Sequence, residues 1–226
     1  MAKKRINGQA STPIYHEKYD LYLRENTYDE YIAKEMRNAY SSLEVDEDTV
    51  LFDMGANIGA FTRKWAPSVK KVYCYEPDEN NFKMLQLNTK DLDNVECIRA
   101  AVGATDDKER VFYINNQTNS AAHSLFVPRG RDEIRVPAVN FDEEVEKYQP
   151  TAIKMDIEGA EYEVIPASKF PSCIKDFIFE IHIRKKAWRV EYLSIEDYLL
   201  NAGFKPIVPL PELKKQLYIV AHYKRF

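Results

Sequence analysis

Short apolar runs alternate with helix-like segments from Val50 to the end of the chain, and this alternation constrains the fold more than any other feature. The strand-like runs are VLFDM, KVYCYE, VECIRA, TAIKMDI, DFIFEIHI, FKPIVP and QLYIVAHY. Amphipathic segments such as IGAFTRKWA, DENNFKMLQLNTK and SIEDYLLNAG lie between most of them. Strands and helices in regular succession indicate an open α/β sheet with helices on both faces. We therefore expect a doubly wound, Rossmann-like α/β fold.

A single domain accounts for the whole chain. Its 226 residues are 45% hydrophobic, enough for one continuous core, and no internal repeat, low-complexity tract or linker interrupts them. We predict one domain over residues 1–226, with a flexible basic lead-in at 1–11, a helical extension at 12–48 and the sheet-forming core at 49–226.

The N-terminal extension is rich in tyrosine. Thr27 and Glu30 stand in the T-x-x-E relation of a capping box, and apolar residues and tyrosines follow at helical spacing. This pattern predicts a helix from Thr27 to Tyr40. Because its tyrosines are amphipathic and the core is complete without it, we expect this helix to cover a ligand cleft.

Charge and cysteine content limit the partners and the compartment. The chain has 32 Lys and Arg against 36 Asp and Glu, and the net charge of −4 gives no overall attraction to nucleic acid or anionic lipid. No stretch approaches the roughly 18 to 20 apolar residues of a membrane span, and no apolar stretch follows the basic first residues as it does in a signal peptide. Cys74, Cys97 and Cys173 are odd in number and form no CxxC pair, so a reducing, cytoplasmic location is expected.

A glycine-containing loop follows the first strand of the core. The segment DMGANIG, residues 53–59, leads into the next helix, and in an open α/β sheet a nucleotide-like ligand binds at this place. Glu76 ends the second strand roughly 20 residues after Gly55, where a carboxylate accepts hydrogen bonds from ribose hydroxyls. Asp53 stands where dinucleotide sites have the first glycine of G-x-G-x-x-G, and its carboxylate repels a pyrophosphate but tolerates a cationic or zwitterionic ligand. A turn that serves only strand-to-helix packing is the alternative.

Several motifs together resemble the FkbM family of class I S-adenosylmethionine-dependent methyltransferases. They are VLFDMGANIGAFT, YEPDENNF, the AAVG turn at 100–103, KMDIEGAE and FEIH. The resemblance implies a class I fold with strand order 3-2-1-4-5-7-6, the last strand being antiparallel. It also implies S-adenosylmethionine as the methyl donor and O-methylation of a hydroxyl on a sugar, glycan or similar small molecule.

The same resemblance assigns a place to the cofactor. The glycine loop would surround the methionine moiety, Glu76 would bind the ribose, and residues 99–101 would lie near the adenine. The residues expected to bind the cofactor are Asp53, Gly55, Ala56, Asn57, Gly59, Glu76, Pro77, Arg99, Ala100, Ala101 and Asp156.

Charged residues crowd the end of the fourth core strand. Lys154, Asp156 and Glu158 interrupt an otherwise apolar run, and Glu161 follows in the first turn of the next helix. Such charges need a partner or a function. Ion pairing and the helix N-terminus are the structural alternative for Lys154, Glu158 and Glu161, whereas the resemblance places Asp156, within the same cluster, in the active site. Asp156, Lys154 and Glu158 are therefore candidate catalytic residues.

His182 is the candidate general base. Alternation along the FIFEIHI strand sends Glu180 and His182 to one face, and this strand ends beside Asp156 in the expected order. An imidazole with an ordinary pKa of about 6.5 is suited to take a proton from an alcohol, although a histidine satisfied within the core is the alternative.

Asp156, Glu158, Glu180 and His182 include the ligand types of a divalent metal site. Because their spacing matches no recognised motif, no metal is expected.

Two further segments have open roles. Residues 104–142 break the strand–helix alternation, and their loop 115–120, with Ser124, carries amide and hydroxyl groups that suit a polyhydroxylated acceptor or an ordinary loop. The run RKKAWR at 184–189 combines cations with an aromatic ring. This composition suits a phosphate, an acidic sugar or nucleic acid, and equally a solvated charge run.

A hydroxylated small molecule or glycan is the expected acceptor. A nucleic-acid methyltransferase is the second hypothesis, favoured by RKKAWR, but the fourth strand leads into MDIE and not into the Asn-Pro-Pro-aromatic element of base-amino methyltransferases. A non-catalytic S-adenosylmethionine-binding protein is the third, and the intact Gly55, Glu76 and Asp156 count against it. A nicotinamide enzyme is disfavoured by Asp53.

Overall fold

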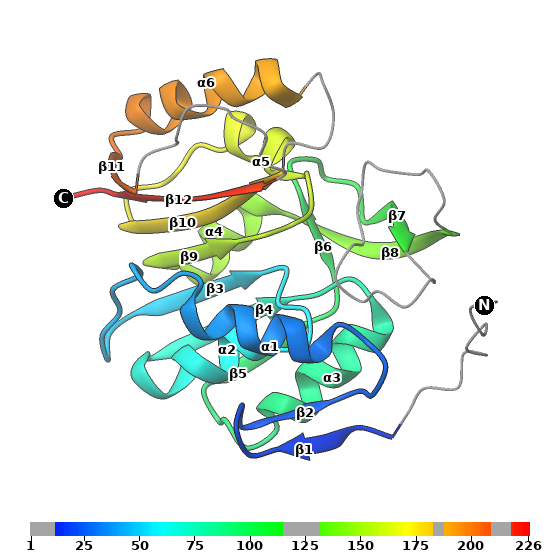
Figure 1. The fold of residues 1–226 in the computed structure, drawn as a ribbon. Coiled ribbons are helices and arrows are strands. Elements are labelled where there is room, and N and C mark those ends of the chain that lie inside the picture. The colour runs from blue at the N-terminus through cyan, green and yellow to red at the C-terminus, as the bar shows by residue number, and fades with distance from the viewer. Residues whose placement is uncertain (1–11, 115–131, 183–187, 209–217) are drawn as a thin grey trace.

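The computed structural model describes residues 12–114, 132–182, 188–208 and 218–226, which form an α/β structure around one central sheet (Figure 1). Within these residues the sheet has seven strands. Their bounds are Val50–Met54 (β3), Lys71–Tyr75 (β4), Val95–Ile98 (β5), Ala152–Met155 (β9), Asp176–His182 (β10), Lys205–Val208 (β11) and Tyr218–Lys224 (β12).

The sheet is mixed, and its spatial order is β11-β12-β10-β9-β3-β4-β5. Strands β5, β4, β3, β9 and β10 are parallel, whereas β12 is antiparallel to β10 and β11 is antiparallel to β12. Numbered 1 to 7 in chain order, the described strands lie in the order 3-2-1-4-5-7-6. The α/β fold that the alternation predicts is confirmed.

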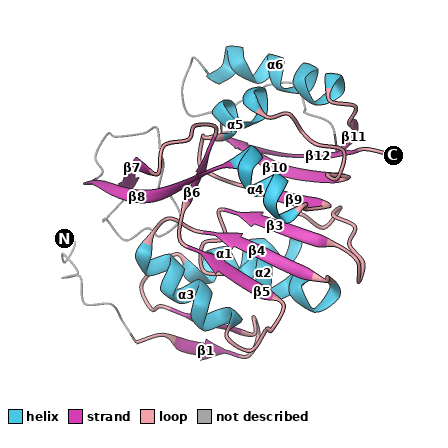
Figure 2. Ribbon diagram, turned by 180° about the vertical axis from the view of Figure 1, so that it is seen from behind, coloured by secondary structure: helices cyan, strands magenta, loops and turns pink. Residues whose placement is uncertain are grey.

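Helices cover both faces of this sheet (Figures 1 and 2). One face carries α2 (Ala60–Trp65), the 3-10 helix Ala66–Ser68 and α3 (Glu79–Thr89), and the other carries α4 (Phe141–Tyr148), α5 (Glu161–Ala167) and α6 (Trp188–Asn201). Leu51 joins Phe61 of α2 in one buried cluster, and Phe52 joins Phe141 of α4 in another. These neighbours in β3 face opposite ways because successive side chains of a strand alternate.

The N-terminal segment forms a hairpin followed by a helix. Strands β1 (Ile14–His16) and β2 (Leu21–Leu23) pair antiparallel, and α1 (Asp29–Asn38) follows them. The hairpin was not expected from the sequence because each strand is three residues long, too short for an alternating pattern to emerge. Residues 12–48 are therefore not a purely helical extension.

The predicted start of the N-terminal helix is wrong. Helix α1 begins at Asp29 rather than Thr27, and the predicted capping box does not form. The Thr27 hydroxyl accepts a hydrogen bond from the Asp29 N–H at 3.2 Å and donates one to the Arg24 carbonyl at 2.8 Å. Glu30 instead accepts one from the Tyr19 hydroxyl at 3.3 Å. Thr27 thus stabilises the turn that precedes the helix.

A small second sheet lies beside the main one (Figure 2). In the described part of the chain it consists of β6 (Ala101–Gly103), β7 (Glu109–Ile114) and β8 (Asp132–Asn140), in the order β6-β8-β7.

The lead-in 1–11, the loop 115–120 with Ser124, and the basic residues 184–186 lie outside the described residues. Among the helices that are described, none is long and apolar enough to cross a membrane.

Candidate functional site

A cavity of about 230 Å³ opens where β3, β4, β9 and β10 end, beside α1. Ligands of open α/β folds bind at this carboxyl edge of the sheet. The predicted site residues in its wall are Gly55, Ala56, Asn57, Glu76, Pro77, Ala100, Ala101, Lys154, Asp156, Glu158 and His182. Three predicted residues, Asp53, Gly59 and Arg99, do not line the cavity.

The two glycines of the loop have different roles. Both adopt left-handed backbone conformations, with φ of 80° at Gly55 and 84° at Gly59. A Cβ atom on Gly55 would lie 1.8 Å from the carbonyl oxygen of Asp156, so only glycine allows the ends of β3 and β9 to approach this closely. A Cβ atom on Gly59 would lie 2.8 Å from the Leu85 side chain on α3. Gly55 therefore shapes the cavity wall, and Gly59 serves packing.

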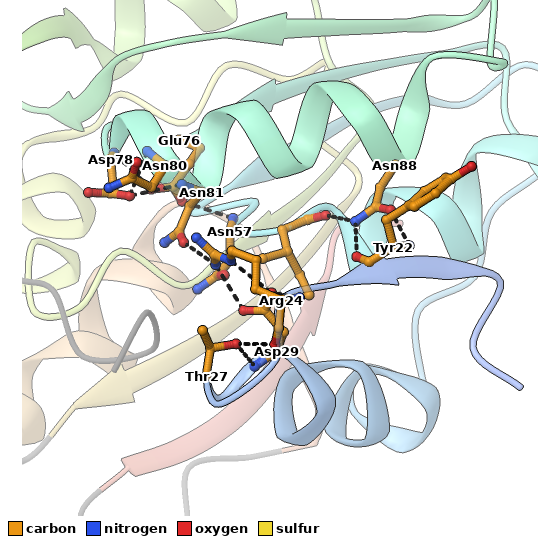
Figure 3. Close-up of polar contacts among 11 residues, drawn as sticks. Tyr22, Arg24, Thr27, Asp29, Asn57, Glu76, Asp78, Asn80, Asn81 and Asn88 are labelled. Carbon is orange, nitrogen blue, oxygen red and sulfur yellow. Dashed lines mark hydrogen bonds and ion pairs between the residues drawn. The ribbon is translucent and has the colours of Figure 1, made fainter. Parts of the chain in front are cut away.

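Glu76 connects the end of β4 to the glycine loop (Figure 3). Its carboxylate accepts hydrogen bonds from the backbone N–H groups of Asn57 and Asp78, each at 2.9 Å. The residue is 5% exposed, and burial raises the pKa of its carboxyl to about 8. Each carboxylate oxygen has a second lone pair, so Glu76 can accept further hydrogen bonds from a ligand in the cavity.

Arg24 ties the N-terminal segment to this region (Figure 3). Its guanidinium donates two hydrogen bonds to the Asp29 carboxylate, at 2.8 and 2.9 Å, and one to the Asn81 side-chain oxygen at 2.8 Å. Asp29 begins α1, and Asn81 belongs to α3, the helix that follows Glu76. This buried network therefore fixes α1 beside the cavity.

Asp53 and Lys154 form a buried ion pair under the cavity wall. The Lys154 ammonium lies 3.1 Å from the Asp53 carboxylate and donates to the carbonyls of Gly55 at 2.9 Å and Met54 at 3.4 Å. The ammonium charge is thereby paired within the protein. The second Asp53 oxygen accepts a hydrogen bond from Thr62 at 2.7 Å. Asp53 is fully buried, which corrects the expected contact between its carboxylate and the ligand.

Acidic groups surround His182 where β9 and β10 end. Side-chain ligand atoms of Asp156, Glu180 and His182 all lie within 4.8 Å of one another. The His182 Nε2 atom is 3.1 Å from a Glu180 oxygen and 3.4 Å from a Glu158 oxygen. On the other side of the ring, Nδ1 is 3.6 Å from a Glu161 oxygen. His182 is 1% exposed, so the imidazole lies buried among three carboxylates.

These carboxylates set the protonation of His182. Burial lowers its pKa, but the charges of Glu158, Glu161 and Glu180 outweigh burial and hold this pKa well above the usual value. Burial, with the nearby charge of Asp156, raises the pKa of Glu180 to about 7. The raised pKa favours the imidazolium form of His182, which has no lone pair to accept a proton. The predicted role of His182 as a general base does not fit this environment.

Toward β5 the cavity wall is apolar. Pro77, Ala100 and Ala101 line it there, and they offer a surface for a flat aromatic group. Arg99 points elsewhere and lies 3.5 Å from Glu79 in a partly exposed ion pair. The expected contact of Arg99 with the ligand is therefore not supported by its position.

One wall of the cavity is formed by α1 and β12, and the sequence did not indicate the contribution of β12. Tyr31 and Glu35 of α1 line it together with Tyr218 of β12, and the Tyr218 hydroxyl donates a hydrogen bond to Glu35 at 3.4 Å. The position of α1 agrees with a predicted N-terminal helix over the cleft. Tyrosine density was a local signal for α1. Tyr218 carries no such signal, because its position depends on β12 pairing with β10.

The family model for the methyltransferase FkbM domain matches residues 53–206, more than half of the chain. No curated protein matches the sequence significantly.

Solved methyltransferase structures share the fold at low sequence identity. An FkbM methyltransferase from Methylobacillus flagellatus KT has a TM-score of 0.53 and 16% identity, over 83% of this chain and 46% of its own. Trm5b from Pyrococcus abyssi has a TM-score of 0.55 and 16% identity, over 98% and 58%. TYW2 from M. jannaschii, in complex with AdoMet, has a TM-score of 0.51 and 17% identity, over 99% and 90%. The chain thus spans about half the length of the first two proteins.

These structures establish the likeness of the fold alone, and the family assignment comes from the sequence. The matched region begins at Asp53 and contains the glycine loop, Glu76 and the acidic cluster at the ends of β9 and β10. The chain belongs to the FkbM methyltransferase family.

Proposed function

We propose that this protein transfers a methyl group from S-adenosylmethionine to a hydroxyl of a sugar, a glycan or a similar hydroxylated small molecule. The observation that carries the proposal is the place of Glu76, a buried carboxylate that faces the cavity and is fixed by the glycine loop. When bound, the cofactor supplies a methyl group on a positively charged sulfur, and the acceptor oxygen forms its bond to this methyl carbon as the carbon–sulfur bond breaks.

The residues present fit such a cofactor. Glu76 would accept hydrogen bonds from the ribose hydroxyls, and the apolar wall at Pro77, Ala100 and Ala101 would contact the adenine. The chain around Gly55 passes close to Asp156, which leaves the methionine moiety between the glycine loop and the acidic cluster. Carboxylates there attract the positive charge of a sulfonium.

The acceptor would bind at the acidic end of the cavity. An alcohol is a poor nucleophile until its proton has a destination, and the carboxylates of Asp156 and Glu180 face the cavity and can take it. The Tyr40 hydroxyl donates to Asp156 at 3.4 Å and so orients this carboxylate. His182, in its charged form, would hold Glu158 and Glu180 in place rather than accept the proton itself.

The charge of the cavity favours a neutral acceptor over a nucleic acid. Carboxylates in its wall would repel the phosphates of a polyanion, whereas hydroxyl groups donate hydrogen bonds to them. Tyr31 and Tyr218 add the aromatic surface on which a sugar ring packs. Filter binding to RNA and DNA at two salt concentrations tests the alternative, since tight, salt-dependent binding would favour a nucleic-acid acceptor.

Calorimetry of S-adenosylmethionine binding tests the cofactor assignment. At pH 9, where Glu76 is ionised, the wild-type chain should bind one equivalent, and Glu76→Gln should weaken binding by about 10-fold or more, because a charge-assisted hydrogen bond contributes roughly 1.5 to 3 kcal/mol. Glu79→Gln, on the exposed start of α3, is the matched control and should bind normally. Equal affinity of Glu76→Gln and wild type would overturn the assignment. A panel of sugars incubated with methyl-labelled cofactor then identifies the acceptor by transfer of label.

A further inference from the structure

We propose that Asp156, Glu180 and His182 form a binding site for one divalent metal ion at the acceptor end of the cavity. The binding of the ion follows from the residues alone, whereas its role in positioning the acceptor rests on the proposed function. The site departs from the sequence-based expectation that no metal is bound.

The distances suit a shared ion. One ligand atom from each of the three residues lies within 4.8 Å of the other two, and His182 Nε2 is 3.1 Å from Glu180. Ligands about 2.1 to 2.2 Å from one ion lie roughly 3 to 4.4 Å from each other, so small side-chain rotations complete the geometry. Glu180 and His182 project from one face of β10, and Asp156 directly follows the neighbouring β9.

The histidine is oriented as a metal ligand is. Its side chain is almost completely buried, and its Nδ1 atom has no hydrogen-bond partner among the described residues. Glu161, fully buried, lies 3.6 Å from Nδ1 and is held by the backbone N–H groups of Ile157 at 2.8 Å and Gly159 at 2.7 Å. A carboxylate near Nδ1 favours a proton on that nitrogen, so a metal ion that displaces the Nε2 proton of the imidazolium would bind at the Nε2 lone pair.

The charge of the cavity also points to a cation. Its wall in the described chain carries five acidic side chains, Glu35, Glu76, Asp156, Glu158 and Glu180, and a cation bound among them would favour their ionised forms. The one lysine in that wall, Lys154, pairs its charge with Asp53 and donates to two backbone carbonyls. A sulfonium adds a single positive charge, so a divalent ion would balance more of the remaining negative charge.

The donor set selects the kind of ion. Carboxylates suit Mg²⁺ and Mn²⁺, and an imidazole suits first-row transition metals, so two carboxylates with one imidazole favour Mn²⁺ over Mg²⁺. An ion held at the ends of β9 and β10 leaves coordination positions open toward the cavity. An acceptor hydroxyl bound there would be oriented and would lose its proton more readily.

Manganese binding to the metal-stripped full chain tests the site. The free Mn²⁺ signal in electron paramagnetic resonance should disappear with one ion bound per chain. Asp156→Asn and Glu180→Gln should each weaken binding by at least about 10-fold, the lower end of what even outer-shell substitutions cause. His222→Gln is the matched control, since His222 is also buried against a carboxylate, Asp176 at 2.6 Å, but lies outside the cavity wall. Circular dichroism establishes that each variant is folded.

A wild-type measurement keeps the test independent of folding in the variants. With ¹⁵N-histidine labelling, Zn²⁺ should shift the ring nitrogens of His182 and leave those of His222 unchanged. Absence of stoichiometric Mn²⁺ binding by wild type, or a shift confined to other histidines, would overturn the site. If S-adenosylmethionine binds but Mn²⁺ does not, only the metal site fails. If Mn²⁺ binds but S-adenosylmethionine does not, the proposed function fails and the metal site stands.

Discussion

Lys154 and Asp53 face each other across the β3–β9 ladder, and their charged groups lie 3.1 Å apart with both side chains at most 2% exposed. The lysine also binds the Gly55 carbonyl at 2.9 Å. The pair therefore connects two central strands and holds the loop that forms one wall of the cavity. Burial raises the cost of an unpaired charge, so the two residues depend on each other.

The first prediction concerns this dependence. Lys154→Met should lower the free energy of unfolding by about 3 to 5 kcal/mol, because it leaves the Asp53 carboxylate buried without a cation. Lys154→Met combined with Asp53→Asn should be more stable than Lys154→Met alone, since the amide is neutral and still accepts the Thr62 hydrogen bond. Urea unfolding of wild type, both single variants and the double variant measures the coupling. A Lys154→Met chain as stable as wild type would mean that the pair contributes nothing.

Glu76 makes cofactor binding dependent on pH. Its pKa in the free protein is about 8, and hydrogen bonds from ribose hydroxyls favour the ionised carboxylate, so binding lowers this pKa and releases a proton. Affinity for S-adenosylmethionine should therefore rise with pH up to about 8 and then level off. Calorimetry between pH 6 and 9, in two buffers of different ionisation enthalpy, measures both affinity and proton release.

Glu76→Gln is the control for this pH dependence. Glutamine has no titrating proton, so the part of the slope that comes from residue 76 should vanish, while any titration of the cofactor itself remains in both proteins. The same slope in both would assign the pH dependence to another group.

Local patterns account for what the sequence predicted well. The strand–helix alternation, the loop around Gly55 and the acid Glu76 at the end of the next strand are each contained in a short segment, and in a parallel sheet such strand ends meet at one edge. The fold and most of the cavity wall can therefore be predicted from residues 50–76 and from the residues at the ends of β9 and β10.

Contacts between distant segments account for what it missed. Asp53 forms its ion pair with Lys154, which lies 101 residues later in the chain, and nothing near Asp53 in the sequence indicates this partner. The protonation of His182 depends on Glu158 and Glu161, which belong to the segment after another strand. The sequence alone suggests an ordinary pKa for His182. In the structure three carboxylates converge on the imidazole and raise this pKa.

The tyrosines in the cavity wall, Tyr31 and Tyr218, should contribute to binding of the acceptor and not to binding of the cofactor. Tyr31 is 54% exposed at the edge of the cavity, so Tyr31→Ala should raise KM for the acceptor about 2- to 10-fold, the scale of one aromatic contact of roughly 0.5 to 1.5 kcal/mol. Its affinity for S-adenosylmethionine should stay at the wild-type value. Tyr198, 44% exposed on α6 and outside the cavity wall, provides the control substitution Tyr198→Ala. Steady-state kinetics with any acceptor that is methylated, together with calorimetry, separates the two effects, and an equal loss of cofactor affinity would argue against an acceptor wall.

Two ion pairs with similar distances between their charged groups should contribute differently to the free energy of unfolding when one is buried and the other is exposed. Arg24 and Asp29 are 2.8 Å apart with side chains 10% and 0% exposed, whereas Lys83 and Glu79 are 2.7 Å apart with side chains 65% and 54% exposed. Arg24→Met should cost about 3 to 5 kcal/mol, because Asp29 loses its cation inside the protein, while Lys83→Met should cost only about 0.3 to 0.5 kcal/mol. Urea unfolding of the two variants at low and high salt measures both values, and salt should reduce only the second, since solvent ions reach the exposed pair. Similar losses in the two variants would mean that Asp29 finds other partners, and that Arg24 is not what holds α1 beside the cavity.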